Sequence, residues 1–247
     1  MNYLFIVLLF LPNLLTNEAK LNYPHWFIYP SDNDSLIVGY SYGKTPSIVD
    51  AATRFTIYKK SKVSGRQEVL VSESKENSFV KNSDYYYDYS KDSANFIQSC
   101  LIPIYQFSSN RILGEFITLF SMDSVKVSVN KTVINLNTLP IPDWVDSVAW
   151  KSGNAFFGVG TYTIKSNEND AWRVAEDRAI IEVLNLYSLK IGTHQTLTRN
   201  SKQDGLEEYF IRQFNHQIKR VHVVARWVDK RFNNACVLIK IESVSLL

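Results

Sequence analysis

The amino-acid sequence predicts an α+β protein, in which helices pack on one face of a mainly antiparallel sheet. Hydrophobic residues make up 45% of the 247-residue chain, which is usual for a folded protein and excludes wholesale disorder. The chain contains 14 Tyr and 14 Phe but only 9 Gly, a composition that favours many strands. A long, divergent internal repeat indicates two tandem modules, each with the element order β-α-β-α-β-β.

The N-terminus has the pattern of a secretory signal peptide. Leu4–Leu15 is mostly apolar, but it is shorter than the about 20 residues that a membrane-spanning helix needs, and Pro12 interrupts it. The chain turns polar from Asn17, so we expect residues 1–19 to be a signal peptide that is cleaved after Ala19. The alternative is a buried strand or helix of the mature fold. No other stretch is apolar enough for a membrane span, so none is expected in the mature chain.

Short motifs recur in the same order in the two halves of the chain. A Pro-x-Trp motif comes first, then a Gly in a β-rich run, then Asp-Ala near the start of a helix. The spacing predicts a first module over residues 20–122, a linker over 123–141 and a second module over 142–247. Chance similarity of short motifs is the alternative. The matched residues are Pro24-His25-Trp26-Phe27 with Pro142-Asp143-Trp144-Val145, Gly39 with Gly158, and Asp50-Ala51 with Asp170-Ala171.

The first copy is expected to contain a strand, a helix, a strand, a second helix and a closing hairpin. The hydrophobic spacing of Ala51, Phe55 and Tyr58 gives the first helix an apolar face. The second helix is indicated by Tyr, Phe and Ile residues at a nearly helical period. The elements are placed, in order, at Leu36–Ser41, from a cap at Ser47 or Asp50 onward, at Gln67–Ser72, across Tyr86–Cys100, and at Ile102–Phe107 with Phe116–Phe120.

The second copy repeats this order. Asp170 is expected to cap a long helix and Gly192 to end it. Small residues at Ala171, Ala175 and Ala179 would let this helix lie close on a sheet. The elements are placed, in order, at Ala155–Thr161, Ala171–Lys190, His194–Thr198, Leu206–Ile218, and Val221–Trp227 with Cys236–Ile241.

The linker contains two short runs that alternate apolar and polar residues, Val125–Val129 and Thr132–Leu136. Such alternation is typical of strands with one buried face. A small hairpin inside the linker is therefore expected as an alternative to a plain connection.

Together these motifs resemble the bacterial lipoprotein-twenty (LPP-type) family of envelope lipoproteins, and the related N-terminal domain of flagellar-assembly envelope proteins. The family-motif residues are Trp26, Gly39, Trp144, Gly158, Gly160 and Trp227. The resemblance implies an exported protein of the outer envelope, often surface-associated, with no established catalysis. The lipid-bearing Cys of the family is absent near Ala19. This departure favours a soluble periplasmic or secreted form over a membrane anchor.

The sequence predicts no enzyme, no metal and no cofactor. Gly158-Val159-Gly160 lacks the third Gly of a dinucleotide-binding loop, so its glycines are expected to permit a bulge or a close helix contact. His216 and His222 are six positions apart, which fits no usual zinc spacing. Adjacent acids such as Glu176-Asp177 are expected on a solvated helix face. Cys100 and Cys236 are left open between a disulfide and two small buried hydrophobic residues.

The charge balance gives no reason to expect a nucleic-acid partner. The chain has 27 Lys and Arg against 24 Asp and Glu, a net charge of only +3. A basic run that follows the first helix, Lys59 to Arg66, is explained by a solvated helix end.

The candidate surface for a ligand or partner is an aromatic cluster of Tyr85, Tyr86, Tyr87 and Tyr89. The alternative places Tyr86 and Tyr89 in the core. We therefore expect an exported, non-enzymatic envelope protein with a structural or protein-interaction role, bound to an envelope partner that the sequence does not identify. The alternative is a small-ligand or glycan-binding protein that uses this cluster or a groove between the modules.

Overall fold

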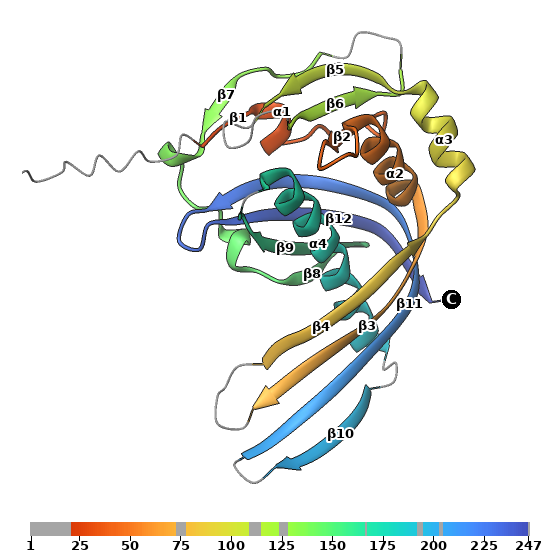
Figure 1. Cartoon of the computed structure of the whole chain (residues 1–247), viewed down its shortest axis with the longest axis vertical. Helices are drawn as coiled ribbons and strands as arrows, with labels where there is room; N and C mark the ends of the chain where they lie inside the picture. The colour runs from red at the N-terminus through yellow and green to blue at the C-terminus, as the bar shows by residue number, and fades with distance from the viewer. Residues whose placement is uncertain are drawn as a thin grey trace, which may run out of the picture.

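Figure 1 shows the protein as a computed structural model. The structure describes residues 21–72, 78–108, 115–123, 128–165, 167–191, 195–202 and 205–246. The expected signal peptide, residues 1–19, lies outside these ranges.

The fold is α+β, as the sequence predicts. Its helices are α1 (His25–Ile28), α2 (Ser47–Lys59), α3 (Lys91–Cys100) and α4 (Glu168–Ile191), with 3-10 turns η1 (Leu136–Thr138) and η2 (Asp143–Asp146). Its strands are β1 (Asn22–Pro24), β2 (Leu36–Tyr40), β3 (Lys60–Ser72), β4 (Ser78–Asp88), β5 (Ile102–Phe107), β6 (Ile117–Ser121), β7 (Val133–Asn135), β8 (Ala149–Ser152), β9 (Ala155–Thr163), β10 (Gln195–Lys202), β11 (Gly205–Asp229) and β12 (Asn234–Leu246).

The strands pair antiparallel in two principal sheets. The smaller sheet has the order β2-β6-β5, and the larger has the order β4-β3-β11-β12-β9-β8, with β10 also paired to β11. The first part of β11 pairs with β3 as far as Lys219, whereas the second part pairs with β12 alone among the residues that the structure describes. In Figure 1, β4, β3, β10 and the first part of β11 extend from the body as a curved arm. The second part of β11 is therefore an edge of the larger sheet inside the body of the molecule.

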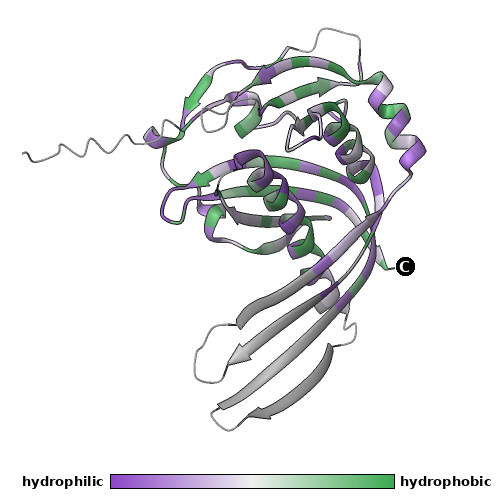
Figure 2. Cartoon of the chain, viewed as in Figure 1, coloured by the Kyte–Doolittle hydropathy of each residue, from purple (hydrophilic) through white to green (hydrophobic). Residues whose placement is uncertain are grey.

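Glycines under the two main helices allow close packing on the sheets. A Cβ on Gly39 of β2 would overlap the Ser47 carbonyl oxygen of α2. A Cβ on Gly160 of β9 would overlap the Ala175 carbonyl oxygen of α4. Both helices join one hydrophobic core, which contains Phe27, Trp172 and Trp227. By contrast, α3 is largely hydrophilic and buries Ala94 alone of its residues (Figure 2).

The second helix that was expected in each copy differs from the structure. In the first copy β4 continues to Asp88, and α3 begins only at Lys91, where the Ser90 hydroxyl accepts a hydrogen bond from Ser93 N at 3.1 Å. In the second copy Leu206–Ile218 is part of β11 and not a helix. Phe214, His216 and Ile218 are buried while the residues between them are more exposed, so the period here is two. Pairing with neighbouring strands decides between the two readings of such a pattern.

The expected helix caps were also wrong. Helix α2 follows Pro46 and has no side-chain cap. Helix α4 begins at Glu168, before Asp170, and the Asn167 side chain accepts a hydrogen bond from Asp170 N at 2.8 Å. In the linker, β7 pairs with β1. The other run of the expected hairpin, Val125–Val129, lies largely outside the described ranges, so the hairpin stays a prediction.

The two halves of the chain share a strand-pairing pattern. In the first, β2 pairs with β6 and β6 with β5; in the second, β9 pairs with β12 and β12 with β11. The short turns α1 and η2, each preceded by a proline, come before these strands. However, the alignment of Asp50-Ala51 with Asp170-Ala171 that the sequence predicts does not match the helix contacts in the structure. Ala51 lies over Gly39, whereas Ala179 and Val183, not Ala171, lie over Gly158.

Candidate functional site

A groove with a volume of about 260 Å³ lies between the smaller sheet and the free edge of β11. Val38 of β2 and its pairing partner Leu119 of β6 line one wall. Val221 and Val223 of β11 line the opposite wall. The groove exists because the two sheets meet without filling the space between them. Other apolar lining residues are Trp26, Leu36, Phe55 and Val129.

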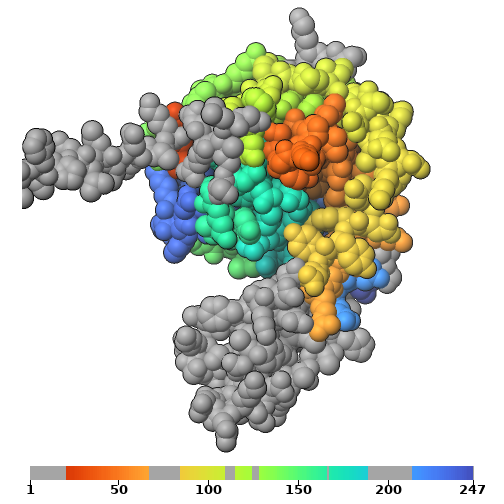
Figure 3. All heavy atoms as spheres, viewed as in Figure 1, coloured from red at the N-terminus to blue at the C-terminus, as the bar shows by residue number. Residues whose placement is uncertain are grey.

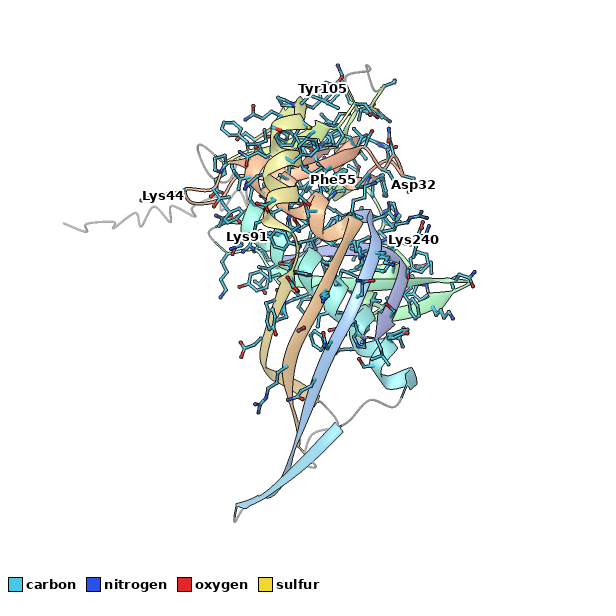
Figure 4. The ribbon with its side chains drawn as sticks, turned by 90° about the vertical axis from the view of Figure 1, so that its right-hand side faces the viewer. Asp32, Lys44, Phe55, Lys91, Tyr105 and Lys240 are labelled. Atoms are coloured by element: carbon cyan, nitrogen blue, oxygen red, sulfur yellow. The ribbon has the colours of Figure 1, made fainter. Side chains whose placement is uncertain are left out.

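Charged side chains surround the mouth of the groove. Asp34 lies 3.8 Å from Lys59 Nζ and 3.6 Å from His222 Nδ1, so it links the loop before β2 to α2 and β11. Arg220 pairs with Glu242 at 3.2 Å. In Figure 4, Asp32 of the same loop and Lys240, which pairs with His222 in the sheet, lie one above the other on one side of the molecule.

A buried carboxylate, Glu176 of α4, forms the floor of the groove and is only 1% exposed. Its Oε2 accepts hydrogen bonds from Arg54 Nη1 and the Tyr58 hydroxyl, each at 2.6 Å. Its Oε1 accepts from the Tyr40 hydroxyl at 2.6 Å and from Arg226 Nη2 at 2.7 Å. The two oxygens are thus surrounded by donors, which is what a buried charge requires.

The surroundings of Glu176 keep it ionised. Burial alone would raise the pKa of this carboxyl, but Arg54, Arg226 and the two tyrosine hydroxyls outweigh burial and lower its pKa. In Asp50 burial prevails over Arg54 and raises the pKa. An ionised carboxylate whose oxygens already accept strong hydrogen bonds is a poor proton acceptor for a substrate. The floor of the groove is therefore suited to structure and binding rather than to acid–base catalysis.

The same network joins the two halves of the chain. Arg54 comes from α2, whereas Glu176 comes from α4 and Arg226 from β11. Arg226 Nη1 also donates to the Phe27 carbonyl oxygen at 2.8 Å, and its guanidinium lies 4.6 Å from the centre of the Phe27 ring. These contacts fix α1, α2 and α4 around the base of the groove.

The predicted tyrosine cluster is divided between two faces of the sheet. Tyr86 is 65% exposed. Tyr85 and Tyr87 lie on the face towards α4, where the Tyr87 hydroxyl donates to Asp177 at 3.2 Å. Figure 3 shows the end of β4, in gold, beside α4, in teal. Tyr89 also packs against the core, so the four rings do not form one surface.

The other residues singled out from the sequence have structural surroundings. Trp26 lines the groove, and Trp227 is buried in the main core. Trp144 packs against a smaller cluster with Val159 and Leu238. Gly39, Gly158 and Gly160 lie beneath α2 and α4.

The sequence interpretation missed the central acids. Glu176 and Asp177 were expected on a solvated face, but Glu176 is buried, and burial raises the pKa of Asp177 to about 6. A signal was present: Trp172, Ile181 and Leu184 lie outside the alanine row of this helix and are also apolar. A helix that is apolar on several sides is surrounded by protein, so its charged residues need buried partners.

Other candidate chemistry is limited within the described ranges. Cys100 and Cys236 are free thiols, and burial raises the pKa of Cys236 to about 12. Among the residues that the structure describes, no cluster of three or more His, Cys, Asp or Glu side chains is arranged to hold a metal ion. In the same residues, no helix combines the length and apolarity needed to cross a bilayer.

The resemblance to envelope lipoproteins remains a prediction that other proteins do not test. When the chain was compared with models of protein families, with curated proteins and with solved structures, no match was found.

Proposed function

We propose that this protein is a non-catalytic binding protein that holds a small, largely apolar molecule between its two sheets. The observation that carries the proposal is the groove itself, with apolar walls from β2, β6 and β11 and a built polar floor. Pre-formed, mostly apolar concavities with a few fixed polar groups are typical of small-molecule sites. Of the two functions expected from the sequence, the groove favours the alternative of ligand binding.

The polar floor supports a binding role. A network that joins α2, α4 and β11 holds the walls apart at a fixed spacing, so the site needs little rearrangement to accept a ligand. Glu176 presents no lone pair that is free of a strong donor, which argues against a catalytic base at this position.

A matched pair of variants tests the proposal. Val223 lines the groove, whereas the adjacent Val224 packs against the separate cluster of Val159, Ala225 and Leu238. Both are half-buried valines of β11. We expect Val223→Phe to weaken binding of Nile red, a neutral apolar dye, by about tenfold or more, because the ring fills the groove. Val224→Phe should leave the dye affinity unchanged within about twofold. Equal effects of the two variants, or no dye binding by the folded wild type, would refute the proposal.

We also propose that the protein is exported and acts in the bacterial envelope, and that its two halves are copies of one module. The apolar N-terminal segment supports export. The shared pairing order of β2-β6-β5 and β9-β12-β11 supports duplication. Cell fractionation tests export directly: we expect the mature chain outside the cytoplasm and shortened near Ala19. A full-length chain in the cytoplasm would contradict this.

The arm favours a second candidate function, assembly with a protein partner. It has the strand order β4-β3-β11-β10, and β4 and β10 form its two edges (Figure 1). Free strand edges are common sites for pairing with another chain. If a protein from an envelope extract is captured by the wild type in a pull-down, replacing residues 67–83 by a short turn should abolish that capture. Nile red binding should stay intact. Retention of the partner by the shortened protein would rule out this role for the arm.

A further inference from the structure

We infer that the ligand of the groove is an amphipathic anion, with its apolar body between the sheets and an anionic head at the mouth. This inference rests on the proposed function and adds the chemical class of the ligand. It derives from the charges at the mouth and from the volume of the groove.

The exposed charges at the mouth are unequal. The exposed and partly exposed charged groups that line the groove, together with their ion-pair partners, are Lys59, Arg220 and Lys240 against Asp34 and Glu242, a net charge of +1 among these described residues. Lys59 Nζ lies 5.3 Å from the centre of the Phe55 ring, so its ammonium group is held beside an apolar lining residue. His222 lies between the two carboxylates, with its Nδ1 3.6 Å from Asp34 and its Nε2 3.8 Å from Glu242, so its ring faces the positions where carboxylates lie. The mouth is thus suited to an anion.

Asp34 shows where an anionic head would lie. Its carboxylate occupies the space between Lys59 and His222, at 3.8 and 3.6 Å. Asp34 and Lys59 are about half exposed, and ion pairs of this kind contribute only about 0–1 kcal/mol. A ligand carboxylate that also brings an apolar chain could therefore take the place of the Asp34 carboxylate at little cost.

The volume limits the apolar body. A space of about 260 Å³ is just below the usual range of small-molecule pockets, about 300–1,000 Å³, so it suits a medium-length acyl chain better than a long one. Its walls offer valine and leucine side chains from β2, β6 and β11 and one indole, from Trp26. A chain of this length with a carboxylate at one end would fill the groove and reach the mouth.

Three probes of one chain length test the inference on the full protein by calorimetric titration. They are decanoate, decanol and decyltrimethylammonium, which differ in the charge of the head. We expect decanoate to bind about tenfold more tightly than decanol, and the cationic probe more weakly than either, because only the anion gains from Lys59 and Arg220.

Variants assign the effect to the mouth. Replacing Lys59 and Arg220 together by Gln should weaken decanoate about tenfold and leave decanol unchanged. Asp34→Asn should strengthen decanoate severalfold, because it removes the competing carboxylate. The control replaces Lys44 and Lys91 by Gln; these exposed lysines are labelled away from Asp32 and Lys240 in Figure 4 and should not affect either probe.

The outcomes separate this inference from the proposed function. If decanol and decanoate bind equally to the wild type, or if the Lys59 and Arg220 changes weaken them equally, the anionic head is refuted while the groove stands as a ligand site. If no probe binds and Nile red does not bind either, the proposed function fails as well. If the cationic probe binds more tightly than decanoate, the inference is refuted and the ligand head is cationic instead.

Discussion

Glu176 is the residue with the most demanding surroundings in the groove. It is 1% exposed and lies between two arginines that are themselves buried, Arg54 and Arg226. The apolar residues on several sides of α4 indicated that its acids would be buried, but they did not indicate which residues would pair with Glu176. Arg54 is 122 positions from Glu176 in the chain and Arg226 is 50 positions from it, each on a different element, and only the fold brings the three residues together.

Removing the charge of Glu176 should destabilise the protein strongly. We expect Glu176→Gln to lower the free energy of unfolding by about 3–5 kcal/mol, because both arginines lose a buried counter-charge. Urea unfolding at neutral pH measures the change. Glu242→Gln, at a more exposed ion pair with Arg220, should cost no more than about 1 kcal/mol. Similar losses for the two variants would show that the network does not stabilise the fold.

Asp177 should make stability depend on pH. Burial raises its pKa from 3.8 to about 6 in the folded protein, so the folded state holds the proton more tightly than the unfolded chain. Its contribution to stability is then present below the unfolded pKa and is lost as pH rises to about 6. We expect Asp177→Asn to stabilise the protein by about 1–3 kcal/mol at about pH 8 and by much less at about pH 4.

Thermal unfolding across this pH range measures the effect of Asp177. The exposed Asp123→Asn serves as the control and should give a curve parallel to that of the wild type. A stabilisation by Asp177→Asn that is equal at both pH values would contradict the raised pKa.

At the scale of elements, helix α4 depends on its close approach to β9. A Cβ on Gly160 would overlap backbone atoms of Ala175 and Ala179, so Gly160→Ala must move the helix. We expect a loss of about 3 kcal/mol or more of unfolding free energy in urea. Gly153→Ala is the control, because a Cβ there meets nothing within 4 Å. The φ of Gly153 is +58°, so we expect backbone strain alone to lower the unfolding free energy, by about 1 kcal/mol. Equal costs would show that α4 can shift freely.

The elements show which sequence signals were sufficient. The hairpin of β11 and β12 was predicted because its long apolar runs indicate strands. The helix α4 was predicted because its row of alanines at every fourth position indicates a helix. The segment Leu206–Ile218 was not, since its hydrophobic residues fit both a helical period and alternation. Its pairing with β3, about 150 residues earlier in the chain, decided for a strand. Local patterns do not contain that contact.

At the scale of the whole molecule, the groove arises where two sheets built from distant segments meet. Its walls combine residues from near positions 26, 38, 119 and 223, and no local motif marks them. The sequence suggested a groove between the halves only as an alternative. Its position follows from β11, which loses its partner β3 after Lys219 and continues as an edge that lines the groove opposite β2 and β6.

Methyl-resolved NMR of the protein titrated with decanol is the most direct test of the claim that the space between the sheets is a ligand site. We expect the methyl signals of Val38, Leu119 and Val223 to shift at saturation, while those of Val159 and Leu238, in the separate cluster beside Trp144, stay in place. Shifts confined to that cluster, or spread evenly over both sets of methyl groups, would contradict it.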